Sequence, residues 1–216
     1  MLHLNGTSTE SSKLLQSIFV VLTAACCLTG SKMVQIGSFI VPASAFCFVF
    51  TYILSNVIAH IDKSYVAKQC IRNAMIGQVV AAILFFLVGL LPAQDPGNQE
   101  AYSEILGQSW ILVLASLVAF YLAQNCQINI FTVLKKKMKL SKASYFSMIV
   151  SQCVDTLVFT VIAFGVGHKY FWSIKGVATF LQICFTQYLV KLVFLTCLNP
   201  AVSILLRTLH KEENRL

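Results

Sequence analysis

The sequence predicts an all-α membrane protein with six transmembrane helices and both termini in the cytoplasm. Of its 216 residues, 57% are hydrophobic and only 11% are charged, with a mean hydropathy of +0.78. A soluble domain of this size needs more polar surface than this composition supplies. A bilayer supplies an apolar solvent instead, and a helix of about 20 apolar residues crosses it with every backbone hydrogen bond satisfied internally.

Six apolar stretches have the length of a membrane span. Four contain no Asp, Glu, Lys or Arg, and two contain one charge each, Asp155 and Lys191. The stretches are 14–31, 33–61, 73–94, 105–134, 143–167 and 176–206. We therefore expect a polar N-terminal tail over residues 1–12, one six-helix domain over 13–209 and a cytoplasmic C-terminal tail over 210–216. The first stretch also has features of a secretory signal peptide, an alternative that we consider weaker because the stretch is long for a signal core.

The basic residues predict the orientation. If both termini are cytoplasmic, twelve of the sixteen basic residues fall inside and three fall outside, with Lys191 in a span. Such a split follows the positive-inside rule. The inner set is Lys13, Lys63, Lys68, Arg72, Lys135, Lys136, Lys137, Lys139, Lys142, Arg207, Lys211 and Arg215, and the outer set is Lys32, Lys169 and Lys175. The net charge of +8 is thus explained by topology and contact with anionic lipid, and we expect no nucleic-acid partner.

Three local patterns modify this simple plan. The stretch 33–61 exceeds one crossing, so Pro42, which follows Gly37 and Ser38, is expected to mark a break or the start of the helix. Pro200 is expected to bend the last span. The connection 91–108 is the longest outside loop, either a plain surface loop or a lid. The eight cysteines show no metal-binding spacing, so neither a metal nor a cofactor is expected.

Asp155 and Lys191 are the residues most costly to place in a span. An ionisable group at the middle of a span costs about 2.5 to 3.5 kcal/mol on insertion scales, so both side chains should face the interior of the bundle. Opposite charges offset each other, and we expect the two to lie together, either paired directly or separated by a ligand. A purely structural ion pair is the alternative.

Polar residues recur at helical spacing around these charges. One face of a helix carries Ser147, Ser151 and Asp155, with Gln152 and Thr156 beside them, and Gln187 precedes Lys191 by four residues. Gln124, Asn125, Gln127 and Asn129 share the fourth span, and Tyr52, Asn56 and His60 are spaced by four in the second. Any single one of them is typical of helix packing. Together they predict a cavity for a flat, polar molecule such as a nucleobase-like ring.

Other functions are less compatible with the sequence. His60, near the cytoplasmic end of its span, is either a proton relay or an ordinary interfacial residue. No H-E-x-x-H or G-x-S-x-G motif is present, and only one acid lies deep in a span, so the sequence favours a protein that is not an enzyme. An intramembrane serine protease using Ser151 and His60 has no further support.

Three segments resemble a known family. Thr-Tyr-Ile-Leu at 51–54, Ser-Gln-Cys-Val-Asp-Thr-Leu-Val-Phe at 151–159, and Lys191 followed by Pro200 are similar to the queuosine precursor transporters, which are themselves similar to the vitamin-binding S components of bacterial importers. The resemblance covers about residues 41–200. It implies a six-helix carrier that imports a 7-deazaguanine compound across the bacterial inner membrane, with Asp155 binding the edge of the ring and Lys191 completing a pocket.

The chain also differs from this family at three positions. Asn56, His60 and Gln127 stand where many relatives have acids. A less anionic pocket favours a less cationic ligand or a differently substituted one such as queuine. On this basis we expect Asp155, Lys191, Gln152, Gln127, Asn56, Tyr52, Thr156 and Gln187 to bind the substrate. The alternative is a binding subunit for another solute or vitamin that needs an energising ATPase partner.

Overall fold

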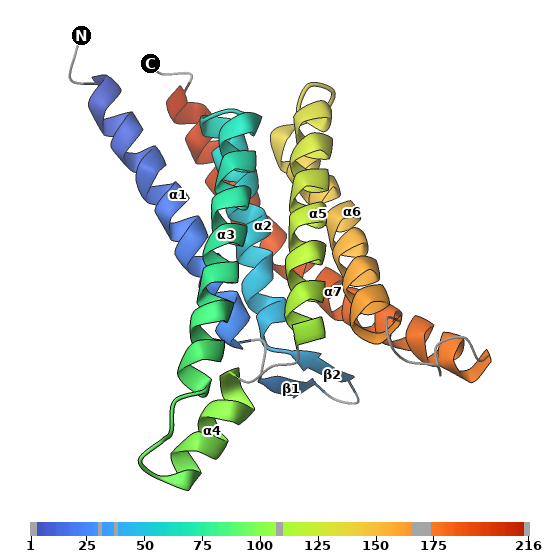
Figure 1. Ribbon diagram of the computed structural model, residues 1–216. Coiled ribbons are helices and arrows are strands. Elements are labelled where there is room, and N and C mark those ends of the chain that lie inside the picture. The colour runs from blue at the N-terminus through green and yellow to red at the C-terminus, as the bar shows by residue number, and fades with distance from the viewer. Residues whose placement is uncertain (1–3, 30–31, 37–38, 107–109, 166–173, 214–216) are drawn as a thin grey trace.

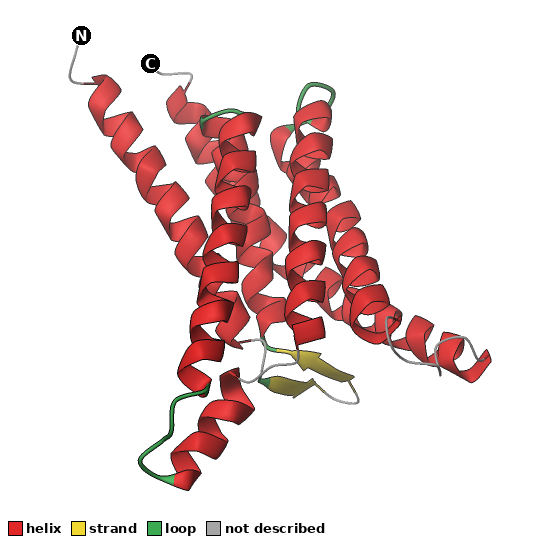
Figure 2. Ribbon diagram, in the orientation of Figure 1, coloured by secondary structure: helices red, strands yellow, loops and turns green. Residues whose placement is uncertain are grey.

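The computed structural model describes residues 4–29, 32–36, 39–106, 110–165 and 174–213, and nearly all of them are helical (Figures 1 and 2). The elements are α1 (Leu4–Thr29), β1 (Met33–Ile36), β2 (Phe39–Pro42), α2 (Ser44–Ile61), α3 (Ser64–Gly89), α4 (Pro96–Leu106), α5 (Trp110–Leu134), α6 (Leu140–Thr160), a π-helical turn (Val161–Gly165) and α7 (Ile174–Glu213). The predicted all-α class is confirmed.

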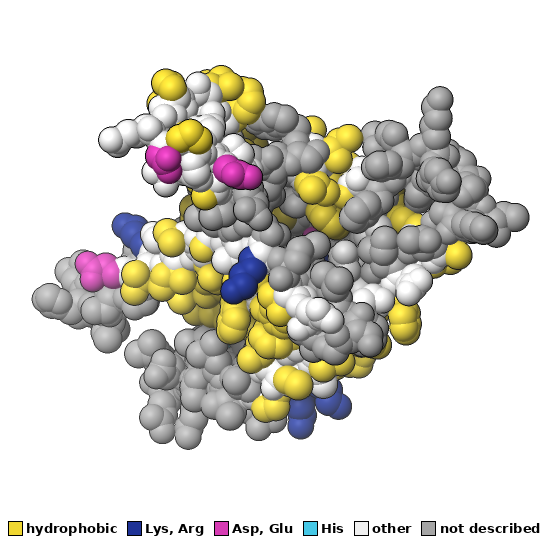
Figure 3. Space-filling model, turned by 90° about the horizontal axis from the view of Figure 1, so that it is seen from below, with side chains coloured by type: hydrophobic (Ala, Val, Ile, Leu, Met, Phe, Trp, Pro, Cys, Tyr) yellow, Lys and Arg dark blue, Asp and Glu magenta, His cyan; other side chains and the backbone are white. Residues whose placement is uncertain are grey.

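Four of the helical segments described are long and apolar enough to cross a membrane: Ser64–Gly89, Ile111–Leu134, Leu140–Ala163 and Phe180–Pro200. Two shorter apolar segments, Ser12–Cys26 and Phe46–Ile61, lie in α1 and α2. All six fall largely within the predicted stretches, so a multi-pass membrane protein is confirmed. Large apolar side chains are exposed along α3, among them Val80, Leu84 and Leu87, as contact with lipid requires. Apolar side chains are also visible among the described residues in the view from the end that carries α4 (Figure 3).

The helices form a bundle whose long axes run broadly in one direction, with α7 crossing behind the others (Figure 1). The beginning of α1, the end of α7 and the α2–α3 and α5–α6 turns lie at the same end. A hydrogen bond between the Ser64 and Thr132 hydroxyls (2.6 Å) ties the start of α3 to the last turns of α5 at this end. Most of the basic residues counted as cytoplasmic belong to these elements. They therefore gather at one end.

The segment before α2 departs from the sequence prediction. Residues 33–42 were counted as part of an apolar span, but β1 and β2 form an antiparallel hairpin in which Val34 pairs with Val41. The β-branched residues Val34, Ile36, Ile40 and Val41 favour strands, and the proline that ends β2 has no backbone N–H for a helix interior. Pro42 marks the start of the helix, as predicted, since α2 begins two residues later. Gly37 and Ser38 lie outside the described residues.

The connection 91–108 is also more ordered than a plain surface loop. It contains α4, which is fastened to the end of α3 by two hydrogen bonds. The Gln99 amide donates to the Gly89 carbonyl (3.0 Å), and the Tyr102 hydroxyl donates to the Phe85 carbonyl (2.8 Å). A Cβ atom at Gly89 would lie 3.2 Å from the Tyr102 ring, so the absence of a side chain permits this close approach.

The last helix continues through its proline. Pro200 lies inside α7, which runs unbroken from Ile174 to Glu213. Helical structure therefore extends past residue 209, and α1 likewise begins at Leu4, inside the polar segment 1–12. The boundaries expected at residues 12 and 209 do not coincide with a change of secondary structure.

Two apolar clusters hold the bundle together, and α2 contributes to both. The first joins α1, α2, α3, α5 and the start of α6, with Phe19, Ile58, Ile71, Phe120 and Phe131 fully or almost fully buried. The second joins α2, α5, α6 and α7 through Val49, Tyr52, Ala123, Met148 and Leu195. The central position of α2 brings its polar residues against α5 and α6.

The contact between α4 and α3 can be tested with Tyr102→Phe, which removes one hydrogen bond and retains the ring. A neutral hydrogen bond contributes about 0.5 to 1.5 kcal/mol, so we expect faster backbone hydrogen exchange in residues 96–106 with little change in Tm. Tyr65→Phe, at an exposed position on α3, is the control. Equal exchange in the two variants would show that the Tyr102 hydroxyl does not hold α4.

Candidate functional site

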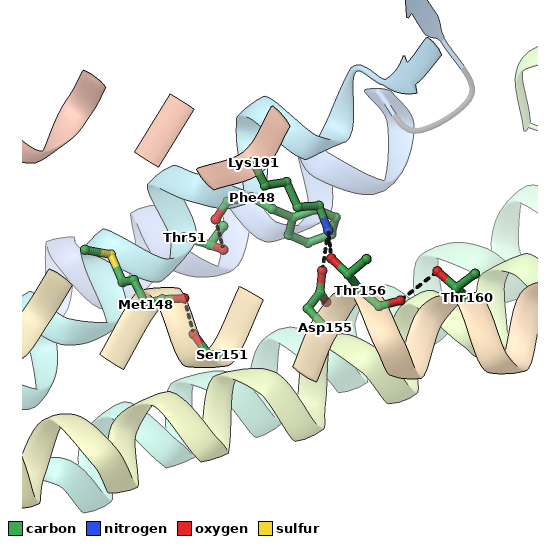
Figure 4. A network of polar contacts seen from close by, with 8 residues as sticks. All are labelled: Phe48, Thr51, Met148, Ser151, Asp155, Thr156, Thr160 and Lys191. Atoms are coloured by element: carbon green, nitrogen blue, oxygen red, sulfur yellow. Dashed lines mark hydrogen bonds and ion pairs between the residues drawn. The ribbon is translucent and has the colours of Figure 1, made fainter. Parts of the chain in front are cut away.

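The two charges placed within predicted spans form a direct ion pair. Lys191 Nζ on α7 lies 2.7 Å from Asp155 Oδ2 on α6, and 3.5 Å from the Thr156 hydroxyl (Figure 4). The Lys191 side chain is 8% exposed and that of Asp155 is 14% exposed. The prediction that these residues lie together is confirmed, in its directly paired form. In a medium of low dielectric constant each ion compensates the other, so the pair fixes α6 relative to α7.

Gln127 joins three helices. Its amide nitrogen donates to the Tyr52 carbonyl (2.6 Å) and the Ser55 hydroxyl (3.3 Å) on α2, and its oxygen accepts from the Ser151 hydroxyl on α6 (3.2 Å). One turn earlier on α5, the Gln124 amide donates to the Thr51 hydroxyl (3.1 Å). These bonds use most of the polar capacity of Gln127, so its main role in this arrangement is to hold α2, α5 and α6 together.

Asn56 makes a second connection between α2 and α6. Its amide nitrogen donates to the hydroxyls of Ser144 (2.9 Å) and Ser147 (3.2 Å), while its Oδ1 has no hydrogen-bond partner among the residues that the structure describes. All three side chains are fully buried. Asn56 thus combines a structural contact with an unused acceptor.

Gln152 on α6 and Tyr52 on α2 lie near the ion pair. Their side chains make fewer hydrogen bonds than those of Gln127 and Asn56. Gln152 is fully buried, and within the described parts of the chain neither of its amide atoms is hydrogen-bonded. It precedes Asp155 by three residues and therefore lies on the same face of α6. The Tyr52 hydroxyl, on α2, lies near Asp155, is fully buried and makes no hydrogen bond within the described residues. Asp155, Lys191, Thr156, Gln152 and Tyr52 are thus the predicted residues that gather around the ion pair.

The remaining predicted residues lie further out. Gln187 is half-buried on α7, one turn before Lys191. His60 is half-buried in the last turn of α2, about 12 Å along the helix from Tyr52 at 1.5 Å per residue. It is next to Ala59, whose carbonyl accepts a hydrogen bond from Lys135 Nζ (3.2 Å). His60 belongs to the basic end of the bundle and is remote from the ion pair.

The hydroxyl groups that complete the interhelical contacts are not among the residues predicted from the sequence to bind the ligand. Thr51, Ser55 and Ser144 are buried and bond to amides of neighbouring helices. Ser and Thr in helices usually bond to their own preceding turn, as Ser55 also does to the Tyr52 carbonyl, so their presence is a weak signal. The i, i+4 spacing of Thr51 and Ser55, beside Tyr52 and Asn56, is the pattern that identifies them. In the described ranges no three metal-binding side chains gather.

A comparison with protein families gives one match. Residues 42–205 match the family described as "Putative vitamin uptake transporter". No curated protein and no solved structure matches the chain. The matched region begins at the end of the hairpin and includes α2 to α6, the ion pair and most of α7.

The ion pair can be tested by its effect on stability. Lys191→Met removes the ammonium and leaves a buried carboxylate uncompensated, which costs about 3 to 5 kcal/mol, and adding Asp155→Asn should recover much of that loss. Thermal unfolding of the purified protein measures both changes. Thr196→Val is the matched control because it removes a neutral α6–α7 hydrogen bond, from Tyr145 (2.9 Å). A loss no larger in Lys191→Met than in Thr196→Val would contradict a buried, coupled pair.

Proposed function

This chain belongs to the vitamin uptake transporter family, and we propose that it imports a 7-deazaguanine precursor of queuosine, or queuine itself. The family makes it a membrane protein that takes up a small molecule. The ligand is the proposal, and one observation supports it: Asp155, Lys191, Gln152 and Tyr52 bring charged, amide and hydroxyl groups together inside the bundle.

The chemistry of these groups fits a flat heterocycle. A carboxylate accepts hydrogen bonds, an ammonium donates them, and a primary amide does both, which together can match the pyrimidine-like edge of a deazaguanine. The Ser-Gln-x-x-Asp-Thr run that resembles queuosine precursor transporters supplies three of the residues, Gln152, Asp155 and Thr156. Lys191 is the fourth residue of that resemblance. It lies on the neighbouring helix and is already paired with Asp155.

Within this proposal the eight predicted residues have different roles. Asp155, Lys191, Gln152, Tyr52 and Thr156 contact the ligand, and Gln187 approaches it from the next turn of α7. Asn56 and Gln127 shape the site through the α2–α5–α6 hydrogen bonds, and Asn56 adds a free acceptor. A proton relay through His60 would serve the basic end of the bundle and would not contact the ligand.

We further propose six crossings of a bacterial inner membrane with both termini in the cytoplasm. The α1 start, the α7 end and the α2–α3 and α5–α6 turns share one end of the bundle, and that end carries most of the Lys and Arg residues. The opposite end carries Asp95 and Glu100 beside or within α4. This distribution fits the positive-inside rule.

Reporter fusions test the topology. A fluorescent protein that folds only in the cytoplasm should fluoresce when fused after residue 216 or in the α5–α6 turn at Lys137, and alkaline phosphatase should be active only when fused in the α3–α4 connection at Gln94. Phosphatase activity at residue 216 would contradict a cytoplasmic C-terminus.

The uptake test uses a bacterial host that lacks both precursor synthesis and its own carrier. The chain should restore queuosine in tRNA when a 7-deazaguanine is supplied. Asp155→Asn should reduce uptake at least about tenfold, because a loss of about 1.4 kcal/mol in binding corresponds to a factor of ten. Asn129→Ala, at an exposed position on α5, is the control, with membrane insertion of every variant checked by immunoblot. Absence of queuosine with any precursor, from a correctly inserted chain, would refute the proposed ligand.

A second candidate follows from the description of the family. A vitamin-binding subunit that depends on an ATPase partner would carry the same ion pair and amides, with a vitamin as its ligand. Reconstitution of the chain alone in liposomes distinguishes a self-sufficient carrier from a binding subunit that needs an ATPase. Transport without a partner favours the carrier, while binding without transport favours the subunit.

A further inference from the structure

Gln152 is an exception among the buried amides of the bundle. The amide nitrogens of Asn56, Gln124 and Gln127 each donate at least one hydrogen bond to another helix. Gln152 is fully buried, yet neither its nitrogen nor its oxygen is hydrogen-bonded to any residue of the described ranges. A buried donor or acceptor without a hydrogen-bond partner is unfavourable, so this amide does not stabilise the packing of the helices.

The surroundings of Gln152 indicate what it faces. On α6 it shares a face with Asp155, three residues on, and Thr156, four residues on, which places it about one helical turn from the ion pair. The ammonium group of Lys191, on α7, contacts this next turn of α6: it is bonded to Asp155 and lies 3.5 Å from the Thr156 hydroxyl. Tyr52 approaches Asp155 from α2. An amide that is free to donate and to accept therefore lies beside a pair of opposite charges that already neutralise each other.

The charges constrain what this amide can bind. Asp155 is the only acid within the six predicted spans, and its charge is compensated by Lys191. A charged group brought beside Gln152 would find no uncompensated partner, and an isolated charge in an apolar interior is strongly disfavoured. The matching group is an uncharged edge with one acceptor next to one donor, as in a lactam, an imide or a primary amide.

We propose that Gln152 is the residue that determines ligand specificity: its amide nitrogen donates a hydrogen bond to the carbonyl of a lactam or amide edge of the ligand, and its amide oxygen accepts one from the N–H of that edge. The inference rests on the proposed function only in assuming that the site binds a small molecule. It covers 7-deazaguanines, whose pyrimidine ring carries a lactam, and also amide-bearing or imide-bearing vitamins. The ligand supplies the partners that Gln152 lacks, so binding recovers the free energy that burial of this amide costs.

Two stability measurements separate this role from helix packing. Gln152→Met keeps the length of the side chain and removes only unmatched polar atoms, so we expect an unchanged or higher Tm together with loss of binding. Gln127→Met is the matched control, because it breaks three interhelical hydrogen bonds and should lower Tm. A fall in Tm for Gln152→Met as large as that for Gln127→Met, or failure of that variant to fold, would assign Gln152 a structural role and overturn the proposal.

Ligand pairs test the chemistry. The purified full chain in lipid nanodiscs is titrated with 7-cyano-7-deazaguanine and its lactam N-methyl analogue, and with riboflavin and its imide N-methyl analogue. We expect at least one unmodified compound to bind about tenfold or more tightly than its methylated analogue, and Gln152→Met to abolish that difference. Equal binding within every pair by the unaltered protein overturns the proposal about Gln152.

The same titration keeps the two proposals distinct. Discrimination within the riboflavin pair, without binding of the 7-deazaguanine pair, would refute the queuosine precursor and support the role of Gln152. Equal affinity for 7-cyano-7-deazaguanine and its methylated analogue, with no discrimination within the riboflavin pair, would support a 7-deazaguanine ligand and refute the role of Gln152. Lack of binding of all four compounds by a folded chain would count against both.

Discussion

The need to compensate buried charge and polarity inside an apolar bundle is the constraint on which this structure depends. Asp155 and Lys191 are individually unfavourable within a membrane, and each is tolerated because the other lies 2.7 Å away. The pair sets the relative position of α6 and α7. The same requirement extends along α6, where Ser144, Ser147 and Ser151 meet amides of α2 and α5.

Helix α2 has the central place in this arrangement. Its apolar residues enter both core clusters, and its polar residues bond to α5 through Thr51 and Ser55 and to α6 through Asn56. Interhelical hydrogen bonds in membranes are individually modest, about 0.6 kcal/mol on average in one well-studied bundle, so the number of such contacts matters more than any one. A rigid α2–α5–α6 unit results, against which α7 is held by the ion pair.

The buried polar groups differ in whether they are hydrogen-bonded between helices. Gln127 resembles Gln152 in type and burial, but its bonds are used between helices, whereas those of Gln152 are not. Membership of an uptake transporter family accounts for a polar centre of this kind. The unused amide atoms of Gln152, beside the ion pair, are the feature of this polar centre that helix packing does not explain.

The sequence by itself determined the class of the protein, because the length and hydropathy of a span are properties of consecutive residues. It also identified Asp155 and Lys191, since an isolated charge in an apolar stretch demands a partner wherever that partner lies. It missed the β1–β2 hairpin and α4, whose residues are compatible with more than one local structure until the strands pair with each other and α4 bonds to α3.

Only the tertiary structure decided which polar residues remain available. Gln152 and Gln127 are indistinguishable by residue type and by spacing, because both lie on polar helix faces among apolar neighbours. Whether an amide is satisfied depends on atoms contributed by other helices, such as Ser55 and Ser151 around Gln127. Those distances are set by helix packing and cannot be derived from the order of residues along one helix.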